Sequence, residues 1–223
     1  MYETDVATNY CSCLAWKFQR RPPNSRDCKH LIKLRGPLQG GSEYQYVDRP
    51  KFHLLAQNVP TKPLDASRYV FSRKFDGIRV QIRPNGDVVS RAGVVLPIKI
   101  RTRSRHPLDA ELCVADQEGH ARCMEALDRG DTDRLVARVF DYWPSKRTTF
   151  EARYHDLLGM TMPRNVELVA QHRFGPGTVQ KQLVDLLRDC EDRHMEGVVV
   201  RSLDALYRVD GKRSSKEMFK SKP

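Results

Sequence analysis

From about Lys51 onward, the pattern of apolar and polar residues predicts short strands mixed with at least one helix. Five segments in which apolar residues alternate with polar ones, or run together, predict strands: YVFSRKF (69–75), IRVQIR (78–83), GDVVSR (86–91), LVARVFDYW (135–143) and EGVVVR (196–201). Asn85-Gly86 stands where two of them meet and is typical of a hairpin turn. TVQKQLVDLLRDC (178–190) instead spaces its apolar residues three and four apart, as a helix does. This mixture predicts an α+β domain.

The chain before this region follows a different pattern. Up to about Tyr46 it is rich in Cys, Arg, Pro and Gly and has little apolar periodicity, so it cannot hold much of a core unaided. The linker RGPLQGGSEYQYVDRP, Arg35–Pro50, contains three glycines and two prolines, which is typical of a boundary. We therefore predict two domains, 1–46 and 47–223.

The charge of the chain favours a nucleic-acid partner. Lysine and arginine total 39 against 28 acidic residues, which gives a net charge of +11 and a pI near 9.5. No apolar run approaches the length of a membrane span, and the N-terminus lacks the layout of a signal peptide. We expect an intracellular protein, cytoplasmic or nuclear, with a viral or phage origin left open, and no membrane partner.

The six cysteines fall into two groups. Cys113, Cys123 and Cys190 stand singly among apolar residues, which predicts small buried side chains. The other three occur in CSCLAWKFQRRPPNSRDCKH, where Cys11-x-Cys13 and Cys28-x-His30 flank a fourteen-residue arm. Two such pairs can converge on a tetrahedral structural zinc ion.

This spacing resembles the SWIM zinc finger, whose signature is Cys-x-Cys, a variable arm and Cys-x-His. The arm combines aromatic with basic residues, which suits contact with a nucleic-acid backbone; they are Trp16, Lys17, Phe18, Arg20, Arg21 and Arg26. Fingers of this kind also bind proteins, so the partner of the arm stays open between DNA and protein.

The stretch FSRKFDGIRVQI, Phe71–Ile82, holds the candidate nucleophile. Its Lys74 lies two residues before Asp76-Gly77, with Arg79 just beyond. Lysines are common on strands and Asp-Gly is common in turns, so this stretch alone is weak evidence of chemistry. Five further short motifs along the chain contain residues that could act together with Lys74. They are SRAG with Arg91, LDAELCV with Asp109 and Glu111, VFDYW with Phe140, MEGVVVR with Glu196, and KEMFKSKP with Lys220 and Lys222.

Together these motifs resemble the covalent nucleotidyltransferases, most closely the ATP-dependent DNA ligases. The resemblance covers roughly Lys51 to Pro223 and includes the complete nucleophile motif Lys-x-Asp-Gly-x-Arg. It implies an adenylation domain of the nucleotidyltransferase (ATP-grasp-like) fold, with antiparallel sheets flanked by helices. The chain ends just after Lys222, so we expect no OB-fold domain in it.

The resemblance implies a role for each charged residue of the site. Lys74 would be the nucleophile that takes AMP from ATP. An amine attacks only when it is neutral, and the cations Lys220 and Lys222 would favour that form and neutralise the phosphate. Glu111 would contact the ribose, and both Glu111 and Glu196 are candidate magnesium ligands.

The remaining candidates would contact the base, the phosphate or the DNA. Phe140 offers a flat face to the adenine, although alone it would be an ordinary core residue in about half of cases. Arg79 offers a fork to the nucleotide phosphate or ribose. Arg91 is the SRAG arginine that lies against the DNA in ligases, and Arg101 and Arg103 belong to the basic run KIRTRSRH.

These expectations add up to an ATP-dependent DNA ligase that seals nicks in duplex DNA as a monomer, with ATP, Mg²⁺ and Zn²⁺. RNA ligases and capping-type transferases share the covalent lysine, and SRAG is the feature that favours a DNA ligase over them. A rival of another class is a zinc-dependent DNA-binding protein on an inactive transferase scaffold. Retention of Lys74, Glu111, Glu196, Lys220 and Lys222 argues against that reading, because an inactive site has no chemical need for them.

Overall fold

The computed structural model describes residues 2–13, 16, 28–35, 45–116, 118–210 and 213–223. The chain divides into two compact units, Met1–Gln45 and Tyr46–Pro223. Each unit has a hydrophobic core of its own. Within the described ranges, every helix is too short or too polar to span a lipid bilayer.

The first unit is built around cysteines. Strands β1 (Thr4–Asp5) and β2 (Tyr10–Cys11) pair in antiparallel fashion, and helix α2 (Lys29–Arg35) follows. The small core consists of residues that are at most 7% exposed: Cys11, Cys13, Trp16, Cys28 and Leu31. The predicted contacts of the arm at Lys17, Phe18, Arg20, Arg21 and Arg26 lie outside the described residues.

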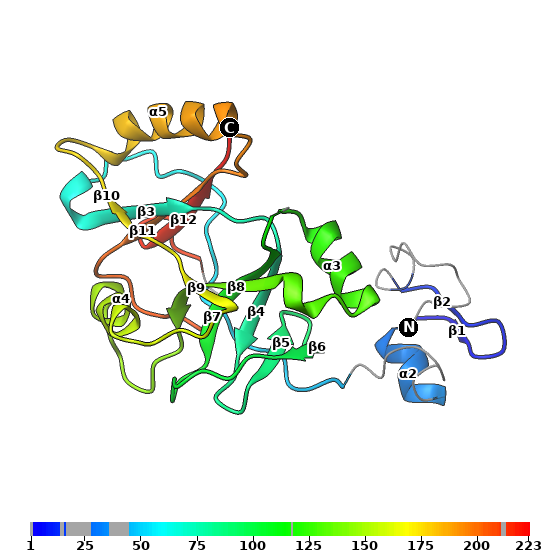
Figure 1. The fold of residues 1–223 in the computed structure, drawn as a ribbon. Coiled ribbons are helices and arrows are strands. Elements are labelled where there is room, and N and C mark those ends of the chain that lie inside the picture. The colour runs from blue at the N-terminus through cyan, green and yellow to red at the C-terminus, as the bar shows by residue number, and fades with distance from the viewer. Residues whose placement is uncertain (1, 14–15, 17–27, 36–44, 117, 211–212) are drawn as a thin grey trace. The chain divides into compact units, whose positions relative to one another are not determined.

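The larger sheet of the second unit has six strands and carries most of the core (Figure 1). Its order is β6 (Val95–Lys99), β5 (Asp87–Ser90), β4 (Ile78–Ile82), β7 (Leu108–Val114), β8 (Leu135–Tyr142) and β9 (Val166–Leu168). The turn η3 (Thr132–Arg134) leads into β8. Helix α3 (His120–Arg129) buries Cys123, Ala126 and Leu127 in the core of this sheet.

One pair in this sheet corrects the expectation of antiparallel sheets, because β8 and β9 run parallel. Helix α4 (Phe150–Leu158) lies between them in sequence. A strand can return parallel to its predecessor only after a long crossover, which here contains α4. The remaining pairs of both large sheets are antiparallel, as predicted.

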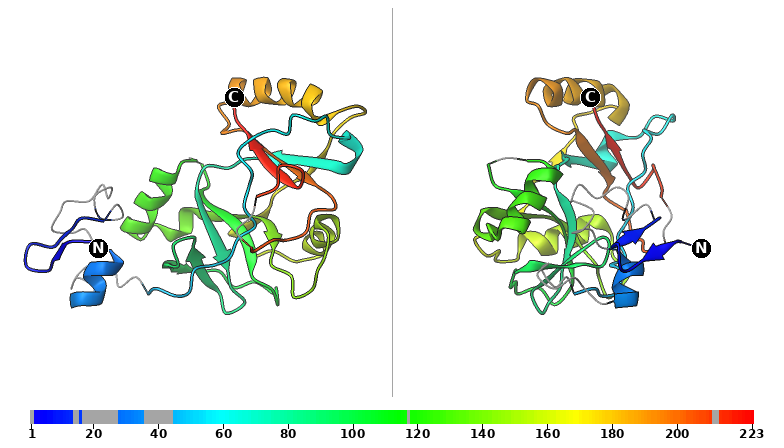
Figure 2. Two further views of the ribbon diagram at one scale, coloured as in Figure 1. Left: turned by 180° about the vertical axis from the view of Figure 1, so that it is seen from behind. Right: turned by 90° about the vertical axis from the view of Figure 1, so that its right-hand side faces the viewer.

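The second large sheet has four strands, in the order β10 (His172–Arg173), β3 (Tyr69–Arg73), β11 (Val198–Ser202) and β12 (Met218–Ser221). The turn η2 (Ala66–Arg68) precedes β3. Helix α5 (Val179–Asp192) lies across one face of this sheet in all three views (Figures 1 and 2). Its Val179, Leu183 and Cys190 join the buried residues of the sheet in one core. The opposite face of this sheet is not covered by α5, and residues of β3, β11 and β12 line a pocket there.

A buried ion cluster ties the two sheets together. Asp141 of β8 accepts hydrogen bonds from Arg153 of α4 at 2.7 and 3.1 Å and from Arg201 of β11 at 2.8 Å. All three residues are at most 5% exposed. Two guanidinium groups around one carboxylate give this cluster a net positive charge, and Arg201 also lines the pocket described below.

The structure confirms the predicted strands and the predicted helix, with ends shifted by one or two residues. Gly86 has φ of +87° in the turn between β4 and β5, which explains why a glycine follows Asn85. Cys113, Cys123 and Cys190 are at most 1% exposed, as predicted.

Candidate active site

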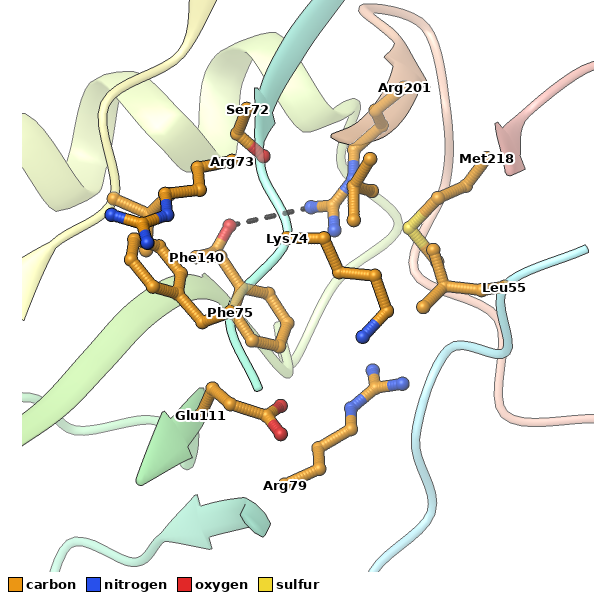
Figure 3. A pocket seen from close by; sticks show the side chains of 12 residues that line it. Leu55, Ser72, Arg73, Lys74, Phe75, Arg79, Glu111, Phe140, Arg201 and Met218 are labelled. Atoms are coloured by element: carbon orange, nitrogen blue, oxygen red, sulfur yellow. Dashed lines mark hydrogen bonds between the residues drawn. The ribbon is translucent and has the colours of Figure 1, made fainter. Parts of the chain in front are cut away.

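A pocket opens between the two sheets, and four predicted residues line it. Lys74, Arg79, Glu111 and Phe140 all contribute, although they come from different strands or their ends. The pocket is completed by residues that the motifs did not single out: Leu55, Ser72, Arg73, Phe75, Val169, Val199, Arg201 and Met218. Figure 3 shows the ends of Lys74, Arg79 and Glu111 pointing into the same space.

Gly77 explains how the segment that carries Lys74 packs so closely against β7. A Cβ atom at Gly77 would lie 2.3 Å from the carbonyl oxygen of Leu112 and 2.8 Å from Sγ of Cys113. Only glycine therefore lets the segment after β3 approach β7 this closely. In the sheet, Arg79 of β4 is the direct partner of Glu111 of β7, which places residues from two motifs side by side.

Glu196 bridges Lys74, the candidate nucleophile, and one of the paired lysines. The Nζ atom of Lys74 donates a hydrogen bond to Oε2 of Glu196, and Nζ of Lys222 lies 2.5 Å from Oε1. Burial raises the pKa of Glu196, but the hydrogen bonds from Lys222 and Lys74 outweigh it, so this pKa is below its ordinary value. Next to it, Gly197 has φ of +135°, and a Cβ there would lie 2.2 Å from the carbonyl oxygen of Ser221.

Lys220 adds a further cation. It lies on β12 opposite Val199 of β11. Burial lowers the pKa of Lys220, and the positive charges of Lys74 and Lys222 lower it further. Because these amines repel one another, the site favours ligands that bring several negative charges, such as a polyphosphate.

Arg79 is anchored by protein groups at the edge of the pocket. Its guanidinium donates to Asp109 at 3.0 and 2.7 Å and to the carbonyl oxygen of His53 at 2.8 Å. Nε and Nη2 of Arg79 are therefore engaged by protein groups, and its contact with the nucleotide phosphate or ribose stays a prediction. The guanidinium lies 4.7 Å from the ring centre of Phe52 and 5.4 Å from that of Phe140, so it makes cation–π contacts with both rings.

Phe140 occupies an irregular point of its strand. Asp109 pairs with Asp141 while Ala110 pairs with Val139, so Phe140 is the extra residue of a β-bulge. It is only partly buried and faces the pocket rather than the core. Arg201 donates to its carbonyl oxygen at 3.4 Å, the bond drawn as a dashed line in Figure 3.

Two pocket residues missed by the motif comparison had a signal in the sequence. Phe75 is the variable residue of the motif Lys-x-Asp-Gly-x-Arg. The guanidinium carbon of Arg138 lies 4.3 Å from the centre of its ring. Arg201 ends EGVVVR, where strand alternation places it on the same face as Val199. Alternation along β11 therefore predicts Arg201 in the pocket.

The candidate DNA-binding arginines lie elsewhere in the second unit. Arg91 is exposed in the turn between β5 and β6, and Arg101 and Arg103 are exposed just after β6. None of the three is among the residues that line the pocket. Their role in DNA binding stays a prediction.

The first unit gathers its four predicted ligands at one point. The ligand atoms of Cys11, Cys13, Cys28 and His30 all lie within 4.8 Å of one another. The Sγ atoms of Cys11 and Cys28 are 3.6 and 3.9 Å from Nδ1 of His30. These separations fit the edges of a tetrahedron with bonds of about 2.0–2.3 Å to a central zinc ion.

The half-buried carboxylate of Glu111 yields a prediction about pH. Burial raises its pKa from 4.5 to about 7, against the opposing charges of Arg79 and Lys74. The folded state then binds the proton of Glu111 more tightly than the unfolded chain does, so stability falls as the pH rises from about 4.5 to about 7. We expect Glu111→Gln to raise the thermal midpoint relative to the wild type at pH 8 but much less at pH 5.

Thermal unfolding of both proteins at pH 5, 6, 7 and 8 measures this effect. The control is Glu191→Gln on the exposed side of α5, which we expect to leave the pH dependence unchanged. A constant difference between Glu111→Gln and the wild type at every pH would contradict the burial argument.

Comparisons with known proteins support the fold. A scan against protein-family models finds no match, and neither does a search of curated proteins. Among solved structures, one from a structure-function study of Lig E DNA ligases is 19% identical, with a TM-score of 0.62 over 79% of this chain and 69% of that one.

Two further structures belong to a DNA ligase and an RNA ligase. The Chlorella virus DNA ligase-adenylate is 17% identical, with a TM-score of 0.55 over 78% of this chain and 69% of that one. An archaeal ATP-dependent RNA ligase is 17% identical, with a TM-score of 0.50 over 76% of this chain and 47% of that one. The chain therefore has the nucleotidyltransferase fold found in the adenylation domains of ATP-dependent ligases.

Proposed function

We propose that this protein is an ATP-dependent DNA ligase that seals nicks in duplex DNA. The observation that carries the proposal is the pocket in which Lys74 lies beside Glu111 and Phe140 and contacts Glu196. A lysine in contact with a carboxylate is common on surfaces, but here the lysine side chain is only 17% exposed and the carboxylate also contacts Lys222.

The reaction would proceed in three transfers. The Lys74 amine attacks the α-phosphorus of ATP, a P–N bond forms, and pyrophosphate leaves. The AMP of this lysyl-AMP intermediate then passes to the 5′-phosphate at the nick and regenerates the Lys74 amine. The 3′-hydroxyl finally attacks the activated phosphate, and AMP leaves as the phosphodiester bond forms.

The residues of the pocket have distinct tasks in the first transfer. Phe140 stacks against the adenine, and Glu111 accepts a hydrogen bond from the ribose. Lys220 and Lys222 neutralise charge on the phosphate as the pyrophosphate departs. Glu111 and Glu196 are the carboxylates that would hold Mg²⁺, which supplies charge neutralisation for the phosphoryl groups.

Two alternatives share the covalent lysine. An RNA ligase or a capping-type transferase would form the same kind of lysyl adduct, and SRAG with its exposed Arg91 favours DNA over both. A zinc-dependent DNA-binding protein on an inactive scaffold would not need the contact of Lys74 with Glu196. Arg91, Arg101 and Arg103 remain the proposed contacts with the duplex, since exposed cations bind phosphates without sequence preference.

The deciding experiment separates these possibilities in two stages. The protein is incubated with Mg²⁺ and either α-labelled ATP or α-labelled GTP, and then given nicked duplexes with DNA or RNA at the nick. A DNA ligase takes label from ATP and seals the DNA nick. Labelling by GTP indicates a capping-type transferase, sealing of RNA alone indicates an RNA ligase, and the absence of any adduct indicates an inactive scaffold.

We further propose that Cys11, Cys13, Cys28 and His30 bind one structural Zn²⁺. Metal analysis of the purified protein is expected to find about one equivalent, and Cys28→Ser is expected to lose most of it because three ligands no longer close the site. Cys123→Ser, in the core of the other unit, is the matched control and is expected to keep the metal. Wild-type protein that folds in full without zinc would rule the site out.

A further inference from the structure

A second hollow lies close to the nucleotide pocket and is lined by a different set of residues. Its volume is about 410 Å³. It lies between the loop that follows β8 and the segment that follows β11. Its lining consists of Trp143, Pro144, Ser145, Lys146, Arg147, Thr148, Leu206, Tyr207 and Arg208. None of these residues has a part in the transfers proposed above.

The lining is cationic. Lys146 and Arg147 are exposed, and neither makes an ion pair with any described residue. Arg208 is also present but is already paired, with Glu217 at 2.8 Å and Asp210 at 3.8 Å. No described residue that lines the hollow is a carboxylate. Two uncompensated cations in a concave site attract an anion.

The lining also offers groups that suit a sugar–phosphate chain. The hydroxyl groups of Ser145 and Thr148 are hydrogen-bonding partners, and that of Thr148 donates to the carbonyl oxygen of Lys146 at 2.8 Å. Trp143 is partly exposed and gives the hollow an aromatic wall. Such a mixture of cations, hydroxyls and an aromatic face is typical of surfaces that follow a nucleic-acid backbone.

The position of the hollow connects it to the reacting centre. Tyr207 lines the hollow, and its hydroxyl donates to Oδ2 of Asp109 at 2.8 Å. The same Asp109 holds the guanidinium of Arg79, which lines the nucleotide pocket. Two side chains, Tyr207 and Asp109, thus link the hollow to Arg79. Arg79 lines the nucleotide pocket together with Lys74, so the hollow is connected to that pocket through these contacts.

We infer that this hollow binds the phosphodiester backbone of the nucleic-acid substrate next to the reacting end. The inference rests on the proposed ligase function and adds a contact site to it. Lys146 and Arg147 neutralise backbone phosphates, while the Trp143 ring packs against the sugar or base. A free nucleotide is the less suitable occupant, because these two cations are exposed and the lining places no carboxylate near a ribose.

The test is the double charge reversal Lys146→Glu/Arg147→Glu in the full chain. Each cation that contacts a phosphate adds about 0.9 to the slope of log affinity against log salt concentration. We expect the variant to lose about 2 units of this slope on a nicked DNA duplex and to bind it at least about 10-fold more weakly at low salt. Self-adenylylation with α-labelled ATP is expected to stay within about twofold of the wild type.

A matched control carries the same change of net charge elsewhere. Lys62→Glu/Lys181→Glu replaces two exposed lysines and is expected to change the slope by much less. Equal affinities and slopes for the two double variants would overturn the inference. So would a variant whose adenylylation falls while its DNA binding is unchanged, because the hollow would then serve the nucleotide. Failure of the wild type to adenylylate or to bind nicked DNA would instead refute the proposed function.

Discussion

Lys74→Ala is expected to abolish the covalent adduct with α-labelled ATP and all sealing that depends on ATP. In the proposed reaction the amine nitrogen of Lys74 forms the bond with phosphorus. The other two lysines of the site are not expected to replace it, because Lys220 and Lys222 lie on or just after β12 and Lys222 is held by Glu196. The expected loss is on the order of 10³-fold or more, as for removal of other covalent nucleophiles. Gel analysis of labelled protein measures it.

Two controls separate chemistry from folding. Lys181→Ala removes an exposed lysine of α5 and is expected to keep full labelling. The Lys74→Ala protein itself is expected to retain some closure of a nick whose 5′ end is already adenylylated, because the lysine is not needed for that transfer. Label on the Lys74→Ala protein would show that another residue is the nucleophile.

The sequence predicted much of the candidate site because motif residues stand at recognisable positions on strands. Lys74, Arg79, Glu111 and Phe140 do line one pocket, and Glu196 and Lys222 contact one another next to Lys74. The pairing of Arg79 with Asp109 was not predictable, because it depends on a register between β4 and β7 that no local pattern reports. The second hollow was missed for a similar reason, since it joins segments about sixty residues apart.

The fold shows where periodicity stops being informative. The alternation or run of apolar residues correctly predicted five strands, namely β3, β4, β5, β8 and β11. Helix α4 was not predicted. One of the three residues that it buries is Arg153, which interrupts the apolar pattern. An arginine at a core position can be explained only by its partner, and that partner, Asp141, lies on a different element.

Asp141→Ala is expected to destabilise the second unit strongly. Asp141 is 1% exposed and accepts hydrogen bonds from Arg153, which is 0% exposed, and from Arg201, which is 5% exposed. Its removal would leave two buried guanidinium groups without their carboxylate. Breaking a buried ion pair in this way typically costs about 3–5 kcal/mol. Denaturant unfolding at pH 7 measures the loss.

The pH dependence gives this prediction a second check. Burial raises the pKa of Asp141, but the charges of Arg201 and Arg153 outweigh it and hold the pKa below its ordinary value of 3.8. The unfolded chain therefore binds this proton more tightly, so the stabilisation is fully present above about pH 4 and is lost as the pH falls through the lower folded value. The difference between the wild type and Asp141→Ala is expected to be constant from pH 5 to pH 8.

Asp185→Ala on α5 is the matched control. Asp185 is exposed and pairs with Arg188 at 3.5 Å, and a surface pair of this kind is worth about 0–1 kcal/mol.

Arg201 also donates to the carbonyl oxygen of Phe140, so Asp141→Ala should weaken ATP binding where the protein remains folded. A loss no larger than that of Asp185→Ala would mean that water or other groups satisfy both arginines, and that the two sheets are held together by their apolar contacts alone.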